Sequence, residues 1–294
     1  MTKTAWMFPG QGSQAVGMGV DWSELPTARE KFAIAEEILG WSVIERCQGD
    51  EATLSKTLYT QPCLYVVEAA IADELQRHGQ RPDLVAGHSL GEYVALYAAG
   101  VFSFEAGLRL VQRRSELMDE ASGGKMAALL GFDRAALVDA IAAIEGVVLA
   151  NDNSDGQAVI SGTPEAVDQI LATVKSKRAV PLAVSGAFHS PHMAEAAAAF
   201  GEILAAVPFA EAAIPVLSNV DPTPTTAADV LKERLVQQMT GSVRWRETMD
   251  AIAAADITTA VEVGPGKVLT GLLKRAHRAI ALVNVGAVAD LPTA

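Results

Sequence analysis

A serine flanked by glycines is the residue best suited to nucleophilic chemistry in this chain of 294 residues. Gly87, Ser89 and Gly91 form a G-x-S-x-G sequence between a short apolar stretch and a segment with helical spacing. Such a pattern predicts a sharp strand-to-helix turn that exposes the serine hydroxyl at a helix N-terminus, where negative charge is stabilised. The alternative is a tight glycine-rich turn with a helix-capping serine. We favour a nucleophile, because the motif has the flanking strand and helix that its geometry requires.

A serine hydroxyl is a weak nucleophile unless a base removes its proton. Of the five histidines, His189 lies on a predicted loop, where catalytic groups are common, whereas His88 is expected to point away from its neighbour Ser89. His189 and His192 have the spacing of half a zinc site, but no further ligands accompany them, so no metal is predicted. No carboxylate stands out as a third triad member. Either a backbone carbonyl orients the histidine, or the triad interpretation is wrong.

Alternating strands and helices indicate that an α/β fold with a mostly parallel sheet positions these groups. Apolar spacing predicts strands at 4–8, 82–87 and, as the last strand, 259–263, with helices at 28–39, 64–77, 90–99 and 228–238. The stretch 126–184 has the β-α-β-β-α-β order of a ferredoxin-like unit, ending in a strand at 179–184. We therefore predict a large α/β-hydrolase-like domain of residues 1–124 and 186–294, into which a ferredoxin-like small subdomain of residues 125–185 is inserted.

Composition narrows the class of protein further. Half of the residues are hydrophobic and the net charge is −12, so we expect a large core and neither nucleic acid nor a membrane as partner. No apolar run approaches the ~18 residues of a membrane span, and the apolar N-terminal stretch is too short for a signal peptide. Cys47 and Cys63 form no paired motif, which argues against a disulfide framework. We expect a cytoplasmic monomer.

Four separate stretches together resemble the malonyl-CoA:acyl-carrier-protein transacylase family of fatty-acid and polyketide synthesis. They are Phe8–Gln14, Gly87–Glu92, Gly186–Ser190 and Val263–Lys267. The resemblance implies that Ser89 is acylated and that His189 is the base. It further implies that the main-chain carbonyl of Gln238 orients the histidine, and that the N–H groups of Gln11 and Leu90 hold the oxyanion.

The resemblance also implies the substrates. An arginine should pair with the malonyl carboxylate, and of the adjacent Arg113 and Arg114 the helical register favours Arg114. Phe188 before His189 is similar to the malonyl-type pattern. No cofactor is implied, because the coenzyme A thioester is the substrate and the phosphopantetheine arm belongs to the acyl carrier protein.

Several alternatives remain beside this hypothesis. A serine esterase or thioesterase shares the G-x-S-x-G sequence, and an acyltransferase of polyketide synthesis shares all four stretches. A non-catalytic carrier-binding module would not need Ser89 and His189. Residues 10–15 also satisfy the dinucleotide fingerprint G-x-G-x-x-G/A, although without the acidic residue expected at a strand end. For docking of an acidic carrier protein, we expect a basic cluster of Lys267, Lys274, Arg275 and Arg278.

Overall fold

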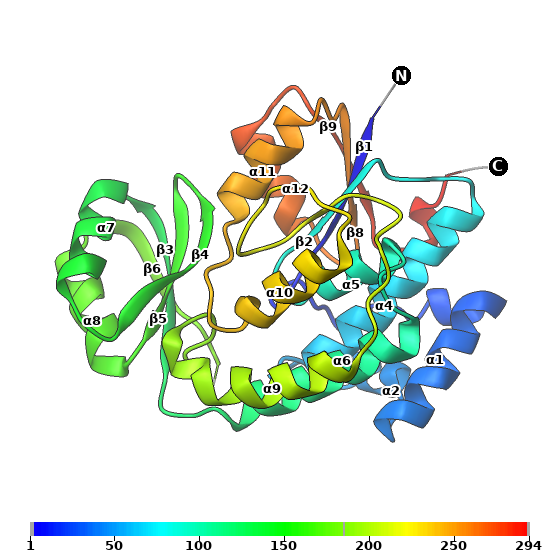
Figure 1. The fold of residues 1–294 in the computed structure, drawn as a ribbon, viewed down its shortest axis with the longest axis horizontal. Coiled ribbons are helices and arrows are strands. Elements are labelled where there is room, and N and C mark those ends of the chain that lie inside the picture. The colour runs from blue at the N-terminus through cyan, green and yellow to red at the C-terminus, as the bar shows by residue number, and fades with distance from the viewer. Residues whose placement is uncertain (1–2, 185, 293–294) are drawn as a thin grey trace.

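A computed structural model describes residues 3–184 and 186–292, and two sheets organise these residues (Figure 1). The larger sheet has five strands in the order β7-β2-β1-β8-β9, and all of its pairings are parallel. In chain order its strands are β1 (Thr4–Phe8), β2 (Leu84–Gly87), β7 (Val216–Leu217), β8 (Thr259–Val263) and β9 (Ala281–Val285). The parallel sheet predicted from the alternating pattern is confirmed.

Helices cover both faces of the larger sheet, which explains why its central strands are continuous apolar runs. In β1, Trp6 and Phe8 face one hydrophobic cluster, while Ala5 and Met7 face another. The helices around this sheet are α1 (Pro26–Leu39), α2 (Val43–Gln48), α3 (Glu51–Leu54), α4 (Thr57–Arg77), α5 (Gly91–Ala98), α6 (Phe104–Glu120), α9 (Ala194–Ala206), α10 (Ala228–Gln238), α11 (Trp245–Ala254) and α12 (Val268–Ala276). None of the helices in the described residues is long and apolar enough to cross a bilayer.

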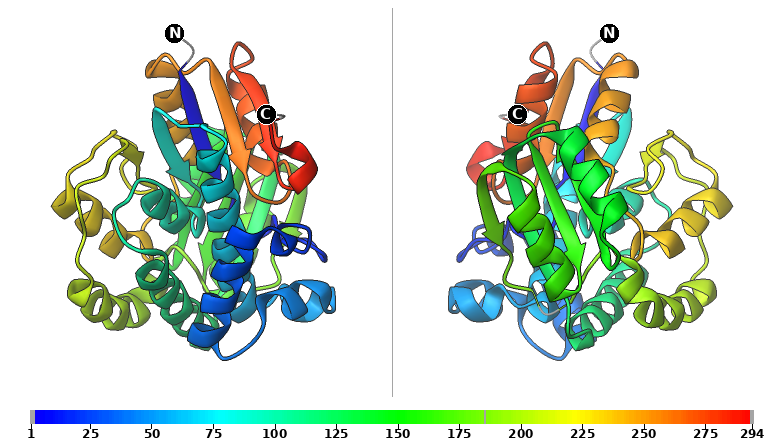
Figure 2. Two further views of the ribbon diagram at one scale, coloured as in Figure 1. Left: turned by 90° about the vertical axis from the view of Figure 1, so that its right-hand side faces the viewer. Right: turned by 90° about the vertical axis from the view of Figure 1, so that its left-hand side faces the viewer.

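The smaller sheet is antiparallel and lies to one side of the larger one (Figures 1 and 2). Its order is β4-β5-β3-β6, and two helices pack on it around a separate core. The elements are β3 (Lys125–Phe132), α7 (Arg134–Ala143), β4 (Val147–Ser154), β5 (Gln157–Gly162), α8 (Pro164–Thr173) and β6 (Ser176–Pro181). They follow the predicted β-α-β-β-α-β order along the chain.

Two strand predictions were wrong, and both concern edge strands. The strand predicted at 179–184 is β6, which spans Ser176–Pro181 and begins with the solvent-facing Lys177 and Arg178. Charged residues protect an exposed sheet edge from further pairing, and they also hide the apolar pattern of the strand. The strand at 259–263 is not the last, because β9 follows it at the other edge of the larger sheet.

Glu68 of α4 is a fully buried carboxyl, and neither of its oxygens has a hydrogen-bond partner in the described residues. Burial raises its pKa well above the ordinary value, and the negative charge of Glu262 adds to this effect. Because the unfolded chain ionises Glu68 at a lower pH than the folded protein does, the folded state loses stability as pH rises above the ordinary carboxyl pKa.

We therefore expect Glu68→Gln to raise the free energy of unfolding at pH 8 by roughly 1–2 kcal/mol, because a neutral amide removes the stability that folding loses when Glu68 ionises in the unfolded chain. The gain should shrink as pH falls below the ordinary carboxyl pKa, where wild-type Glu68 is protonated in both states. Urea unfolding at several pH values measures this difference. A gain that stays the same at every pH would contradict the explanation.

Candidate active site

The backbone at Ser89 has the strained turn that the G-x-S-x-G sequence predicts. Ser89 stands between β2 and α5 with a φ of 51°. A Cβ on Gly87 would lie 1.9 Å from the carbonyl carbon of Gly91, and one on Gly91 would lie 2.0 Å from the Phe8 oxygen. Neither position can therefore carry a side chain. The close approach of strand and helix holds the serine at the start of α5.

His189 meets this serine from the loop that follows the smaller sheet. Its Nε2 lies 2.8 Å from the Ser89 Oγ, and its Nδ1 lies 2.9 Å from the Gln238 carbonyl oxygen and 3.2 Å from that of Gly241. An Nδ1–H that donates to these carbonyls leaves Nε2 free to accept the serine proton. Ser89, His189 and Asp256 are the non-glycine residues with positive φ in the described chain, so both members of the pair carry backbone strain.

The electrostatic setting keeps His189 neutral. Burial lowers its pKa to about 3, and the positive charge of Arg114 contributes to the shift. The hydrogen bonds to backbone carbonyls act in the opposite direction but are the weaker effect. A neutral imidazole is the form that can accept a proton, so the free protein holds its candidate base ready over a wide range of pH.

Arg114 of α6 places a buried positive charge beside the nucleophile. Its Nη2 donates to the Ser89 Oγ at 3.2 Å and to the Gln238 Oε1 at 3.1 Å, and its Nη1 donates to the Gln61 Oε1 at 2.7 Å. Within the described residues it has no carboxylate partner at ion-pair distance, whereas Arg113 points outward and pairs with Glu116. A fully buried guanidinium with neutral partners is suited to an anionic group of a ligand.

Two further residues of the site, Asn219 and Glu92, did not emerge from the sequence. Asn219 accepts from the Ser89 N–H at 2.7 Å and donates to the Gly87 carbonyl at 2.6 Å. Glu92 in turn accepts from the Asn219 N–H at 3.0 Å and from Gln238 Nε2 at 2.8 Å. Asn219 follows β7 at the carboxyl end of the parallel sheet, where ligand sites gather, and that position was the available signal.

Asn219→Ala should lower kcat by roughly 10–100-fold and leave KM nearly unchanged. The strained Ser89 backbone would lose the hydrogen bond from its N–H to the Asn219 side chain, and the hydroxyl would then leave its reactive geometry. Steady-state kinetics with the thermal midpoint recorded in parallel would test this. Thr223→Ala, on the exposed loop after Asn219, is the matched control and should retain full kcat. A variant that raises KM alone would assign Asn219 to binding instead.

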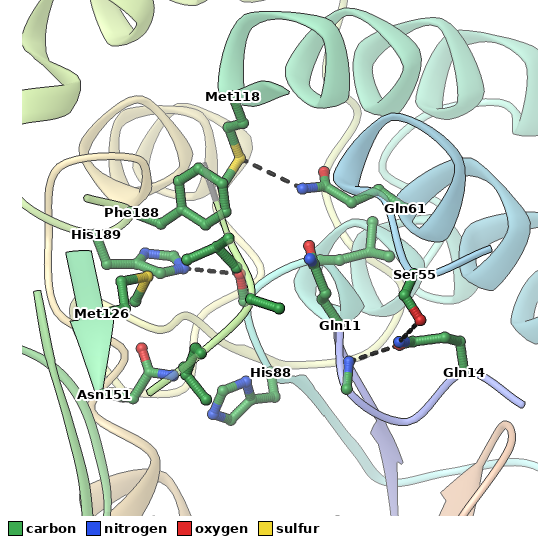
Figure 3. A pocket seen from close by; sticks show the side chains of 16 residues that line it. Gln11, Gln14, Ser55, Gln61, His88, Met118, Met126, Asn151, Phe188 and His189 are labelled. Atoms are coloured by element: carbon green, nitrogen blue, oxygen red, sulfur yellow. Dashed lines mark hydrogen bonds between the residues drawn. The ribbon is translucent and has the colours of Figure 1, made fainter. Parts of the chain in front are cut away.

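A cavity of about 280 Å³ opens onto Ser89 and His189 (Figure 3). The apolar side chains that line it include Met118, Met126, Leu182 and Phe188. Gln11 and Leu90 also line the cavity, and neither of their backbone N–H groups donates to another group in residues 3–184 and 186–292. Two unused N–H donors beside a nucleophile are the components of an oxyanion hole.

His88 also lines the cavity, but its ring forms a hydrogen bond to a residue of the smaller sheet. Its Nε2 lies 2.8 Å from the Asn153 Oδ1, so it pairs with that sheet and not with Ser89, as expected.

The dinucleotide alternative does not fit the fold, because residues 10–21 form turns and the first α-helix begins only at Pro26. In the described residues, no cluster of three or more potential metal ligands surrounds His189 and His192.

The four basic residues expected to dock a carrier protein all lie outside the cavity. Lys267, Lys274, Arg275 and Arg278 are exposed on α12 or beside it. Arg275 borders a separate surface hollow next to the turn between β4 and β5. The structure therefore groups these residues along one helix but does not bring them to the nucleophile.

This fold and site define an acyltransferase, with a strained serine, a neutral histidine and N–H donors facing one cavity. The chain belongs to the acyl transferase domain family, which matches residues 5–292.

Named relatives narrow the resemblance within that family. The chain is 62% identical over 289 residues to the malonyl CoA-acyl carrier protein transacylase of Synechocystis, covering 98% of this chain and 99% of that protein. The crystal structure of the Synechocystis malonyl-CoA:ACP transacylase superposes with a TM-score of 0.97 at 61% identity, covering 98% of each chain. A malonyl-transacylase in complex with a type II PKS acyl-carrier protein superposes with a TM-score of 0.93 at 38% identity, covering 98% of this chain and 97% of that one.

Proposed function

We propose that this protein transfers malonyl from malonyl-CoA to the phosphopantetheine thiol of an acyl carrier protein in fatty-acid biosynthesis. The observation that carries the proposal is the buried Arg114, whose Nη2 lies 3.2 Å from the Ser89 Oγ. A carboxylate at one end of a short acyl group can pair with this guanidinium while the thioester carbon at the other end meets the serine. The names of the relatives support the same substrates.

The reaction proceeds through a malonyl-Ser89 ester in two displacements. His189 takes the Ser89 proton as the oxygen attacks the thioester carbon, and the N–H groups of Gln11 and Leu90 stabilise the resulting oxyanion. Collapse of this intermediate breaks the C–S bond, and the protonated His189 returns its proton to the leaving coenzyme A thiolate. The carrier thiol then repeats the sequence, with His189 as its base and Ser89 as the leaving group.

Residues 1–124 and 186–294 form the catalytic domain and residues 125–185 the small subdomain, a division supported by the separate core of the smaller sheet. Ser185, at the proposed boundary, lies outside the described residues. The protein needs no cofactor for this reaction, because the side chains around Ser89 and the thioester supply every group that reacts. A monomer stays an expectation from the sequence. Cytoplasmic location stays an expectation from composition.

Intact-protein mass spectrometry after brief mixing with malonyl-CoA tests the function directly. We expect a malonyl adduct on the wild type, none on Ser89→Ala, and discharge of the adduct by a carrier protein. Free malonate without an adduct would identify a hydrolase instead. Pairing the chain with carrier proteins of fatty-acid and of polyketide synthesis would separate the two pathways.

Docking of the acidic carrier protein is proposed to use the exposed basic residues along α12. Reversing the charge of Lys274 and Arg275 to glutamate should raise KM for the carrier about tenfold and leave KM for malonyl-CoA within twofold, because the lost attraction acts on association. Arg178→Glu, on the exposed edge strand β6, is the matched control. An unchanged KM for the carrier protein would show that the carrier docks on another surface.

A further inference from the structure

Glu92 is a buried carboxyl that takes no part in the proposed reaction. It lies in the first turn of α5, just after Ser89, and its side chain is fully buried. Unlike the buried Asp152, which pairs with Arg134, it has no ion-pair partner in the described residues. Its Oε1 has no hydrogen-bond partner there either. Burying a carboxylate without a cation is costly, so its few contacts point to a role in the site.

The side-chain hydrogen bonds of Glu92 meet at one atom, Oε2. This oxygen accepts from the Asn219 N–H at 3.0 Å and from the Gln238 Nε2 at 2.8 Å. Those two residues hold the backbone of Ser89 from both sides. Asn219 Oδ1 accepts from the Ser89 N–H at 2.7 Å, and Gln238 Nε2 donates to the Ser89 carbonyl at 2.9 Å. One carboxylate oxygen therefore supports both groups that fix the strained nucleophile.

The side-chain amide of Gln238 links Glu92 to Arg114. Its Nε2 donates to Glu92, and its Oε1 accepts from the Arg114 Nη2 at 3.1 Å. A carboxylate can only accept and a guanidinium can only donate, so both neighbours require the same orientation of the amide. Exchanging the amide oxygen and nitrogen would set NH₂ against the guanidinium and oxygen against the carboxylate. The three side chains therefore form one chain of hydrogen bonds with a single arrangement of donors and acceptors.

The groups around Glu92 act against the cost of its burial. Burial raises the pKa of Glu92, whereas the hydrogen bonds from Gln238 and Asn219 and the positive charge of Arg114 lower it. Each of these groups stabilises a carboxylate more than a neutral carboxyl. Glu92 and Arg114 contact opposite ends of the Gln238 amide, so their charges both favour the dipole in its observed direction.

We infer that Glu92 is a positioning residue for acyl selection, because it holds the Gln238 amide that aims the Arg114 guanidinium. This inference rests on the proposed function and adds a residue that acts without touching the substrate, since Glu92 is not among the described residues that line the cavity. Its bond to Asn219 serves every acyl donor, because Asn219 holds the Ser89 backbone. Its bond to Gln238 serves only donors whose acyl group carries a carboxylate.

The test compares malonyl-CoA with acetyl-CoA in variants of Glu92. Glu92→Leu removes the acceptor at similar volume, and it should lower the ratio of the malonyl to the acetyl kcat/KM about tenfold, the effect of one hydrogen bond to a charged group. Both donors should also lose a common factor of activity through Asn219. Glu92→Gln has an amide oxygen that can accept the same two hydrogen bonds, so it should keep the ratio within about threefold of the wild type.

Glu105→Leu is the matched control, because Glu105 also lies in the first turn of a helix, α6, but is exposed. It should keep the wild-type ratio. Thermal midpoints report whether the variants fold. Should Glu92→Leu not fold, Glu92→Asp takes its place: the shorter side chain draws the carboxylate away from Gln238 and should lower the ratio about threefold or more.

The outcomes separate this inference from the proposed function. Equal losses for both donors in Glu92→Leu, or in Glu92→Asp in its place, would overturn the inference and leave Glu92 as a support of Asn219 alone. A ratio that falls as far in Glu92→Gln would also overturn it, because an acceptor at this position would then not be what holds Gln238. A wild type that is acylated by acetyl-CoA but forms no malonyl-Ser89 ester would refute the proposed function and the inference together.

Discussion

Replacing His189 with alanine is expected to lower the rate of Ser89 acylation about 10³–10⁴-fold, with the fold intact. The reason is that the Ser89 Oγ, now 2.8 Å from Nε2, would lose the group that takes its proton. Stopped-flow mixing with malonyl-CoA, followed by acid quench and mass measurement, gives the acylation rate. The exposed His192→Ala is the matched control, because that residue lies three positions away on the same loop and should retain the wild-type rate.

The same histidine sets the expected pH dependence. A base works only when neutral, so its activity is present above its pKa and is lost as pH falls through that value. Because burial lowers the pKa of His189 to about 3, kcat/KM should stay flat from pH 8 down to about pH 5. An ordinary histidine would lose activity near pH 6.5. Inflection of the kcat/KM profile near that value would show that the base is solvated or is another residue.

Arg114→Met is expected to lower kcat/KM for malonyl-CoA by about 10²–10³, since the carboxylate of the acyl group would be buried without its bidentate partner. The long apolar side chain replaces the volume of the arginine and removes its charge. Acetyl-CoA, which has no carboxylate, should be affected less than threefold. The ratio of the two kcat/KM values therefore measures selection of the acyl group.

The matched control for this experiment is Arg113→Met, which removes a charge from the outer face of the same helix, where Arg113 pairs with Glu116 at 2.8 Å. Both acyl donors should retain wild-type kinetics in that variant. Equal losses for malonyl-CoA and acetyl-CoA in Arg114→Met would mean that the arginine positions Ser89 and does not read the carboxylate.

Local sequence rules predicted the parts of the site that lie close together in the chain. The glycines around Ser89 are required by contacts below 2.5 Å to a hypothetical Cβ, so the motif itself encodes the turn. The choice of Arg114 over Arg113 followed from helical register, because neighbouring residues on a helix face in different directions. The loop position of His189 made it the candidate base, but the Gln238 carbonyl as its partner was available only through the family resemblance.

The rest depended on contacts between distant segments. Asn219 reaches Ser89 across 130 residues. The place of Asn219 after a short strand is only a weak signal, since an asparagine there is also typical of an ordinary turn. The edge strand β6 was misplaced for a different reason: Lys177 and Arg178 near its start interrupt the apolar pattern.

Gln238 contacts the base, the arginine and the nucleophile with three different atoms. Its main-chain oxygen meets His189, its Oε1 accepts from Arg114, and its Nε2 donates to the Ser89 carbonyl at 2.9 Å. Any amino acid keeps the main-chain oxygen, but few keep the other two contacts. Substitution at this one position would therefore keep the contact to His189 and remove the contacts to Arg114 and to the Ser89 backbone together.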